Sequence, residues 1–145
     1  GELSSFKQPK SEENVNEVID AFGFDFVSQP QVKYTLHKQK KKEGMFETDQ
    51  FTIRLSEFYS DGLLYSPEDF KNFETLSLVL IDLDYEADPF TMDMHLWGKD
   101  LVKDETTPVE ISIDAEKWKK AKLAVILIDE YGNEKKLVLD KKDFK

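Results

Sequence analysis

Two apolar runs at the end of the chain constrain the fold more than any other feature of the sequence. Within residues 122–139 (KLAVILIDEYGNEKKLVL), six apolar residues follow one another at 123–128 and three more at 137–139. The sequence Tyr131-Gly132-Asn133 between them is typical of a turn, and two short apolar runs around a turn indicate a β-hairpin. Residues 76–85 (LSLVLIDLDY) have the same character. We therefore expect these two segments to lie at the centre of the fold.

The beginning of the chain predicts a short helix. Residues 1–10 are polar, and we expect a flexible segment there. Ser11 followed by two acidic residues favours a helix start, and Gly23 is suited to end it. Apolar residues at 15, 18, 19 and 22 fall on one face of such a helix. Packing against the core is the interpretation we favour for this stripe, and a surface that receives a partner helix is the alternative.

Alternating apolar residues predict strands after this helix. We expect a first strand at 31–38, a polar hairpin loop at 38–44, and a half-exposed strand carrying Phe51, Ile53 and Leu55 on one face. Ser66-Pro67 followed by two acids is typical of a helix start. Alternation resumes at 90–96 and at 109–113, and a short helical turn is expected at 114–121.

This order of elements predicts a mainly β (α+β) class. The expected architecture is an immunoglobulin-like antiparallel β-sandwich preceded by a short helix and a hairpin. A single β-rich domain should cover residues 11–145, with the helix and hairpin in 11–75 and the sandwich in 76–145. A chain of 145 residues is long enough to bury a core.

The composition excludes several classes of function. The net charge of −10 disfavours a large nucleic-acid interface, although a local basic patch could still contact a phosphate backbone. The absence of cysteine excludes disulfides, thiolate zinc sites and cysteine nucleophiles. We see no signal peptide and no apolar run long enough to span a bilayer, so a cytoplasmic location is expected. The first residue is Gly rather than Met, as in a chain excised from a longer protein.

Acidic residues near the end of the 76–85 segment are the candidate metal ligands. Asp82, Asp84 and Glu86 would share one face of a strand, and Ca²⁺ requires several converging oxygen ligands. No glycine folds this segment around an ion, and the twelve-residue calcium-loop pattern is absent. We favour a solvated strand end over a metal site here. A paired-carboxylate or metal-dependent hydrolase remains an alternative that no motif supports.

Lysines between the first two expected strands are the candidate nucleic-acid contact. Lys38, Lys40, Lys41 and Lys42 form the one basic concentration in the sequence, and at a hairpin tip they could contact a phosphate backbone. A solvated loop is the alternative that we favour. The two tryptophans, Trp97 and Trp118, could form a ligand platform, but packing is the interpretation we favour for both.

Four sequence words carry a resemblance to a known family. They are FTIR at 51–54, LSLVLIDLDY at 76–85, FTMD at 90–93 and VILIDEYGNE at 125–134. In order and spacing they resemble the C-terminal region of the DNA methyltransferase (modification) subunit of type III restriction–modification systems. The catalytic Asp-Pro-Pro-Tyr and Phe-x-Gly-x-Gly motifs of that family are absent, so no catalytic residue and no S-adenosylmethionine contact is transferred.

The resemblance implies a non-catalytic accessory domain of a DNA modification or restriction protein. Its expected partners are a restriction subunit or the rest of a parent chain, with DNA as a further possibility, and no cofactor or membrane. On this interpretation the chain alone is not an enzyme, although it could be a fragment of an adenine-specific methyltransferase. The alternative is a free-standing immunoglobulin-like protein-binding domain with exposed Phe or Trp as its anchor.

Overall fold

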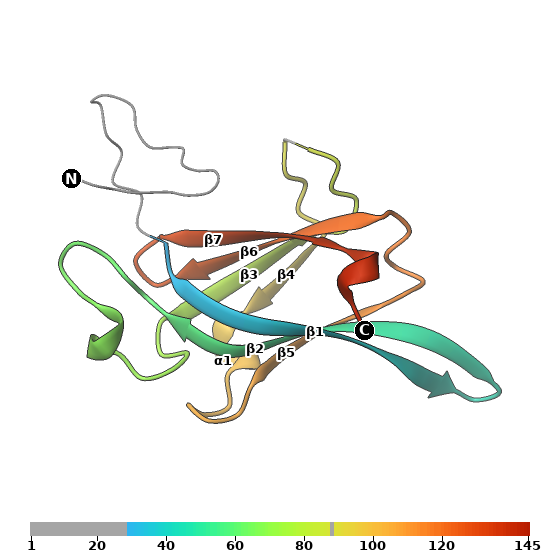
Figure 1. The fold of residues 1–145 in the computed structure, drawn as a ribbon, viewed down its shortest axis with the longest axis horizontal. Coiled ribbons are helices and arrows are strands. Elements are labelled where there is room, and N and C mark those ends of the chain that lie inside the picture. The colour runs from blue at the N-terminus through green and yellow to red at the C-terminus, as the bar shows by residue number, and fades with distance from the viewer. Residues whose placement is uncertain (1–28, 88) are drawn as a thin grey trace.

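The computed structural model describes residues 29–87 and 89–145, which form two antiparallel β-sheets (Figure 1). One sheet has the order β1-β2-β5, with β1 (Gln31–Glu43), β2 (Phe46–Tyr59) and β5 (Val109–Asp114). The other has the order β4-β3-β6-β7, with β4 (Met94–Trp97), β3 (Leu76–Asp82), β6 (Lys122–Asp129) and β7 (Glu134–Asp140). The helical elements of this part are η1 (Pro67–Asp69), α1 (Gly98–Leu101) and η2 (Lys141–Asp143). The mainly β class is confirmed.

The two apolar segments lie at the centre of the four-stranded sheet, as predicted. β3 and β6 are its inner strands, and they pair with each other antiparallel along most of their length. β6 and β7 form the expected hairpin, and Gly132 in its turn has a φ of +86°, a left-handed conformation that favours glycine. The helix expected from Ser11 lies outside the described residues.

The core lies between the two sheets. Its apolar residues alternate along each strand, so that Phe51, Ile53 and Leu55 of β2 face inward as predicted. Trp118, which precedes β6, is fully buried and meets Phe51 edge-on at a centroid distance of 5.0 Å. Phe144, after η2, packs against both rings and completes an aromatic cluster at this end of the sandwich.

Three strand boundaries differ from the prediction. The loop expected at 38–44 is wrong, because β1 continues to Glu43 and the turn lies at Gly44, whose φ is +64°. The strand expected over 76–85 ends at Asp82, and the strand expected over 90–96 begins only at Met94. The hairpin expected ahead of the sandwich is itself part of it, because β2 pairs with β5.

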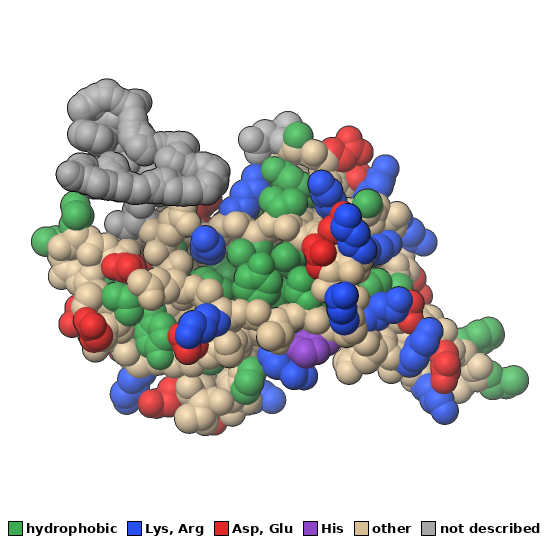
Figure 2. All heavy atoms as spheres, in the orientation of Figure 1, with side chains coloured by type: hydrophobic (Ala, Val, Ile, Leu, Met, Phe, Trp, Pro, Cys, Tyr) green, Lys and Arg blue, Asp and Glu red, His purple; other side chains and the backbone are tan. Residues whose placement is uncertain are grey.

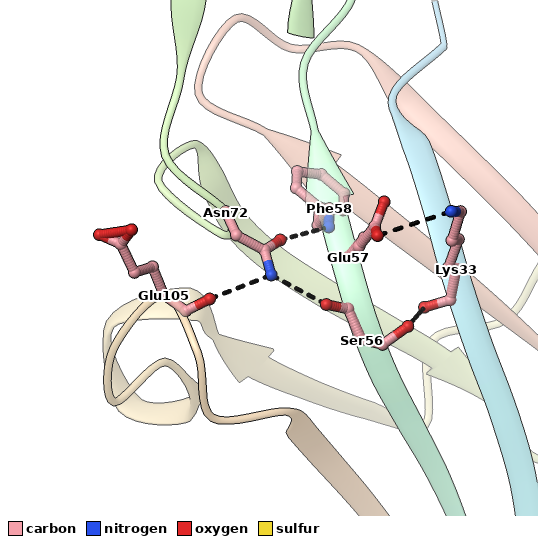
Figure 3. A network of polar contacts seen from close by, with 6 residues as sticks. All are labelled: Lys33, Ser56, Glu57, Phe58, Asn72 and Glu105. Atoms are coloured by element: carbon pink, nitrogen blue, oxygen red, sulfur yellow. Dashed lines mark hydrogen bonds and ion pairs between the residues drawn. The ribbon is translucent and has the colours of Figure 1, made fainter. Parts of the chain in front are cut away.

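A single asparagine joins β2 to two loops (Figure 3). The side chain of Asn72 accepts a hydrogen bond from the amide of Phe58 at 2.9 Å and donates to the carbonyl of Ser56 at 2.8 Å. It also donates to the carbonyl of Glu105 at 3.2 Å. Toward the C-terminal end of β2 the pairing with β5 stops at Leu55, opposite Val109, so Asn72 satisfies backbone groups of β2 just beyond the first residue of β5.

Candidate functional site

The most prominent projection of the described part of the chain is the hairpin arm, which we define as residues 39–49. The last pair between β2 and β5 is Gln50 with Asp114, so beyond it β1 and β2 continue as a two-stranded ribbon (Figure 1). The pairing of β1 with β2 remains in register to Glu43 and Phe46. The arm therefore carries its tip away from the body of the sandwich.

The tip of the arm is apolar. The side chains of Met45 and Phe46 are 97% and 75% exposed. Figure 2 shows this apolar tip at the far end of the projection, with charged side chains behind it. Large apolar side chains exposed together at the end of a projection are typical of contacts with another molecule.

The candidate lysines lie on strand β1 and are largely paired with carboxylates of the protein. Lys40 Nζ is 2.8 Å from Asp49 Oδ1, and Lys38 Nζ is 3.8 Å from Asp49 Oδ2. The hydrogen bond between Lys40 and Asp49 raises the pKa of Lys40 and lowers the pKa of Asp49. Lys41 Nζ lies 3.6 Å from Asp114 Oδ1. These contacts offset the positive charge that the sequence places here.

The predicted acidic face does not form. β3 ends at Asp82, and the side chain of this residue is buried, with 2% of the residue exposed. Its carboxylate accepts hydrogen bonds from the amides of Asp84 and Thr91, at 2.9 Å each. Asp84 and Glu86 are exposed, and both lie within 4.0 Å of Lys120 Nζ. Within residues 29–87 and 89–145, no group of three or more His, Cys, Asp or Glu side chains could hold a metal ion.

A buried polar cluster was missed by the sequence analysis. Asp129, at the end of β6, accepts a hydrogen bond from the Ser60 hydroxyl at 2.7 Å, and Ser60 also contacts the hydroxyl of Thr75 at 2.6 Å. The other carboxylate oxygen accepts the amides of Tyr131 and Asn133. A serine beside a buried acid is found at some catalytic sites, but the two described histidines lie elsewhere. This cluster ties the β6–β7 turn to the ends of β2 and β3.

The remaining candidates are distributed over different surfaces. The ring of His37 contacts the Thr35 hydroxyl at 2.8 Å on β1, whereas His95 is on β4 beside Trp97. The two histidines therefore lie on different sheets. Trp118 belongs to the core, which agrees with the packing role expected for it, while Trp97 is 47% exposed on β4. The two tryptophans thus form no common platform.

Comparison with known proteins assigns neither a family nor a function to this chain. No family model, no curated protein and no solved structure matches this chain significantly. The resemblance to the type III modification subunit therefore stays a prediction. Among the described residues, no helix is long and apolar enough to cross a membrane.

Proposed function

We propose that this chain is a non-catalytic β-sandwich interaction domain that binds a protein partner through the hairpin arm. The observation that carries the proposal is the pair of exposed apolar side chains, Met45 and Phe46, at the end of a projecting two-stranded ribbon. A partner with an apolar cavity would remove both side chains from water. Burial of two large apolar side chains supplies about 3–6 kcal/mol, which is enough to anchor an interface.

An immunoglobulin-like topology is the finer architecture that we infer. If the strands are lettered A, B, C, C′, E, F and G in chain order, the two sheets read A-B-E and C′-C-F-G. Immunoglobulin sandwiches place A, B and E in one sheet and C, F and G in the other, and the variable type adds C′ beside C. This agreement of strand order supports the inference.

The biological setting follows from the sequence resemblance. We propose that the domain serves a DNA modification or restriction protein in the cytoplasm and that its partner is the restriction (helicase–nuclease) subunit or the remainder of a parent chain. The four resembling segments include β3 and parts of β2 and β6, which contribute many residues to the core. These segments therefore build the core of the domain, and the hairpin arm makes the proposed contact with the partner.

The partner contact is tested by a matched pair of double variants. Met45→Asp with Phe46→Asp alters the tip, whereas Leu63→Asp with Leu64→Asp alters an exposed apolar pair in the loop after β2, where the two side chains are 81% and 95% exposed. We expect the restriction subunit, when co-expressed, to be retained by the wild-type chain and by the loop variant but lost by the tip variant. Equal retention by all three chains, or by none, would refute the proposal.

Contact with a DNA backbone is the second candidate, favoured by the row Lys38, Lys40, Lys41 and Lys42. Removal of Asp49 tests it, because this carboxylate competes with phosphate for Lys38 and Lys40. If the lysines bind DNA, Asp49→Asn should tighten the retention of duplex DNA, and replacement of the four lysines by Ala should abolish it. If the arm binds protein alone, neither change alters DNA retention.

A further inference from the structure

Strand β1 forms one edge of its sheet, and its two halves differ in how that edge is protected. The even-numbered positions share one face of the strand, and along the arm, at 38, 40 and 42, they are all lysines. Charged side chains on an edge strand discourage pairing with a further strand. Before the arm the even-numbered positions are Val32, Tyr34 and Leu36 instead. Residues 31–37 therefore form a strand edge with no protecting charge on this face.

The backbone of this stretch directs hydrogen-bonding groups away from the sheet. The amide of Lys38 donates to the carbonyl of Lys145 at 2.9 Å, so it points away from β2. Because successive amides of a strand alternate in direction, those of Tyr34 and Leu36 point the same way. Among the described residues, no strand pairs with this side of β1. The stretch offers about 23 Å of unpaired edge, enough for a further strand of about seven residues.

The same stretch borders an opening at the side of the sandwich. β1 and β7 are the facing edges of the two sheets in Figure 1, and Figure 2 shows apolar side chains gathered between them. Leu36 is only partly buried and Tyr34 is 36% exposed, whereas Ile53 and Leu55, which lie opposite them on β2, are fully buried. The core is therefore closed in the middle of the sheet and incompletely covered at this edge.

Contacts within the chain limit the opening at both ends. At one end Lys135 Nζ, on β7, donates to the side chain of Gln29 at 3.3 Å, just before β1 begins. At the other end the carbonyl of Lys145 accepts the amide of Lys38. The second contact is a single rung of strand pairing on the outer edge of β1, and residues 31–37 lie between the two.

We propose that this edge receives an extended segment of a partner protein, about seven residues long, in which apolar and acidic residues alternate. Its backbone pairs with the outward groups of Tyr34 and Leu36. Its apolar side chains lie in the opening beside these two residues, and its acidic side chains lie on the other face, beside Lys33. The inference rests on the proposed function in requiring a protein partner, and it adds a second contact next to the hairpin arm, into which β1 continues.

The charge of β1 supports an acidic occupant. This strand carries five lysines and one acidic residue, whereas the whole chain has a net charge of −10. The side chains of Lys33 and Lys40 remain 72% and 65% exposed although each lies near a carboxylate of the protein. Opposite charges between adjacent strands steer the encounter and fix the register. A second copy of this acidic chain is the less suitable occupant.

Synthetic peptides test the proposal on the unaltered full chain. The probe is a capped nine-residue peptide in which valine and glutamate alternate, and its control has the same composition with all valines first. We expect the alternating peptide to bind with a dissociation constant below about 1 mM and the control not to bind. N-methylation of the central valine or of an adjacent glutamate removes a donor from one edge of the peptide only, so one of the two should abolish binding. Equal effects of the two methyl groups, or no binding of the alternating peptide, would overturn the proposal.

Amide hydrogen exchange locates the bound peptide. Exchange at Tyr34 and Leu36 should slow in the complex, while the free edge of β5 stays unchanged. Tyr34→Asp places a charge in the opening and should weaken binding by about tenfold or more. Val138→Asp, at a residue 49% exposed on β7, is the matched control and should bind as the wild type does. Protection at another edge, or equal binding by both variants, would contradict the assignment.

Two further measurements separate this inference from the other contacts. Met45→Asp with Phe46→Asp should bind the peptide like the wild-type chain, so loss of the arm contact and loss of the strand contact are read independently. Sedimentation of the chain alone tests a second copy as the occupant. A dimer in which Tyr34 and Leu36 become protected as the protein concentration rises would overturn the proposal in favour of self-association.

Discussion

Two aspartates have the same structural role at the ends of the two central strands. Asp82 closes β3 and Asp129 closes β6, and both are 2% exposed. In each, one carboxylate oxygen accepts the amide two residues further along, from Asp84 and from Tyr131, at 2.9 Å. This shared role accounts for the aspartate in the near repetition of VLID at 79–82 and ILID at 126–129; the aliphatic residues of the two words face opposite sides of the sheet, since Val79 and Ile81 belong to the core and Ile126 and Ile128 do not. A buried strand that must turn sharply requires an acceptor for the exposed amides.

The first prediction concerns Asp129. Asp129→Ala leaves the amides of Tyr131 and Asn133 and the hydroxyl of Ser60 without this acceptor, so the free energy of unfolding should fall by about 2–4 kcal/mol. Asp129→Asn keeps one acceptor oxygen and should cost less. Urea denaturation measures both, with Asp100→Ala, at an exposed position of α1, as the control. Similar losses for Asp129→Ala and the control would show that the buried cluster contributes little.

Asp104 provides a prediction on pH. Four hydrogen bonds lower the pKa of Asp104 from 3.8 to about 2. They come from the hydroxyl of Thr107, the amides of Thr106 and Thr107, and the hydroxyl of Thr106. A carboxyl whose folded pKa is lowered stabilises the fold above its unfolded pKa, and this contribution disappears as the pH falls through about 2. Wild-type protein should therefore melt higher than Asp104→Asn above pH 3.8, and the difference should shrink toward pH 2. A difference independent of pH would contradict this.

At the scale of elements, the predictions succeed where alternating apolar residues face the core and fail where a strand is polar or, as at 90–93, where the alternation continues outside the strand. The core-facing residues of β2 and β5 and the β6–β7 hairpin follow from the sequence, because burial requires apolar side chains at every second position. Lys38 to Lys42 carry no such pattern. Their strand is held by backbone pairing with β2 and by contacts such as Lys40 with Asp49, which become visible only when the partner strand is known.

Asn72 gives the prediction at this scale. Its side chain joins β2, the loop after β2 and the loop before β5 through three hydrogen bonds, and none of its partners could be identified from the sequence spacing. Asn72→Ala should lower the free energy of unfolding by about 1–3 kcal/mol, because the amide of Phe58 loses its acceptor. Asn72→Asp keeps the acceptor but places a carboxylate against the carbonyls of Ser56 and Glu105, so it should not restore stability.

Hydrogen exchange locates the effect of these variants. Loss of the Asn72 contacts should increase exchange at Phe58 without changing the amides of the hairpin arm, at the other end of β2. Thermal or urea unfolding of both variants supplies the energies. Wild-type stability in Asn72→Ala would show that water replaces the side chain at no cost.

At the scale of the whole molecule, the sequence indicates what is buried but not which surfaces meet. The two central strands could be predicted because each is a local apolar run, whereas the pairing of β2 with β5 joins residues about 60 positions apart. The candidate site shows the same limit. The lysines could be predicted as a charge cluster, but their pairing with Asp49 and Asp114 and the exposed tip beside them depend on the fold.

The aromatic cluster of Phe51, Trp118 and Phe144 closes one end of the sandwich and gives the last prediction. The ring of Phe144 lies 5.3 Å from Phe51 and 5.5 Å from Trp118, and the next carbonyl, of Lys145, accepts the amide of Lys38 at 2.9 Å. The end of the chain therefore contacts both the core and the edge of β1. Phe144→Ala should lower the free energy of unfolding by about 3–5 kcal/mol, because it opens a cavity beside two rings.

Trp118 reports on this change directly. In Phe144→Ala its emission should shift to longer wavelength in the native state, since water gains access to a side chain that is fully buried in the wild-type protein. Leu64→Ala, at a side chain 95% exposed, is the control and should change stability by less than about 0.5 kcal/mol. If both variants unfold at the same urea concentration, the aromatic cluster does not hold the two sheets together, and the aliphatic residues between them must do so.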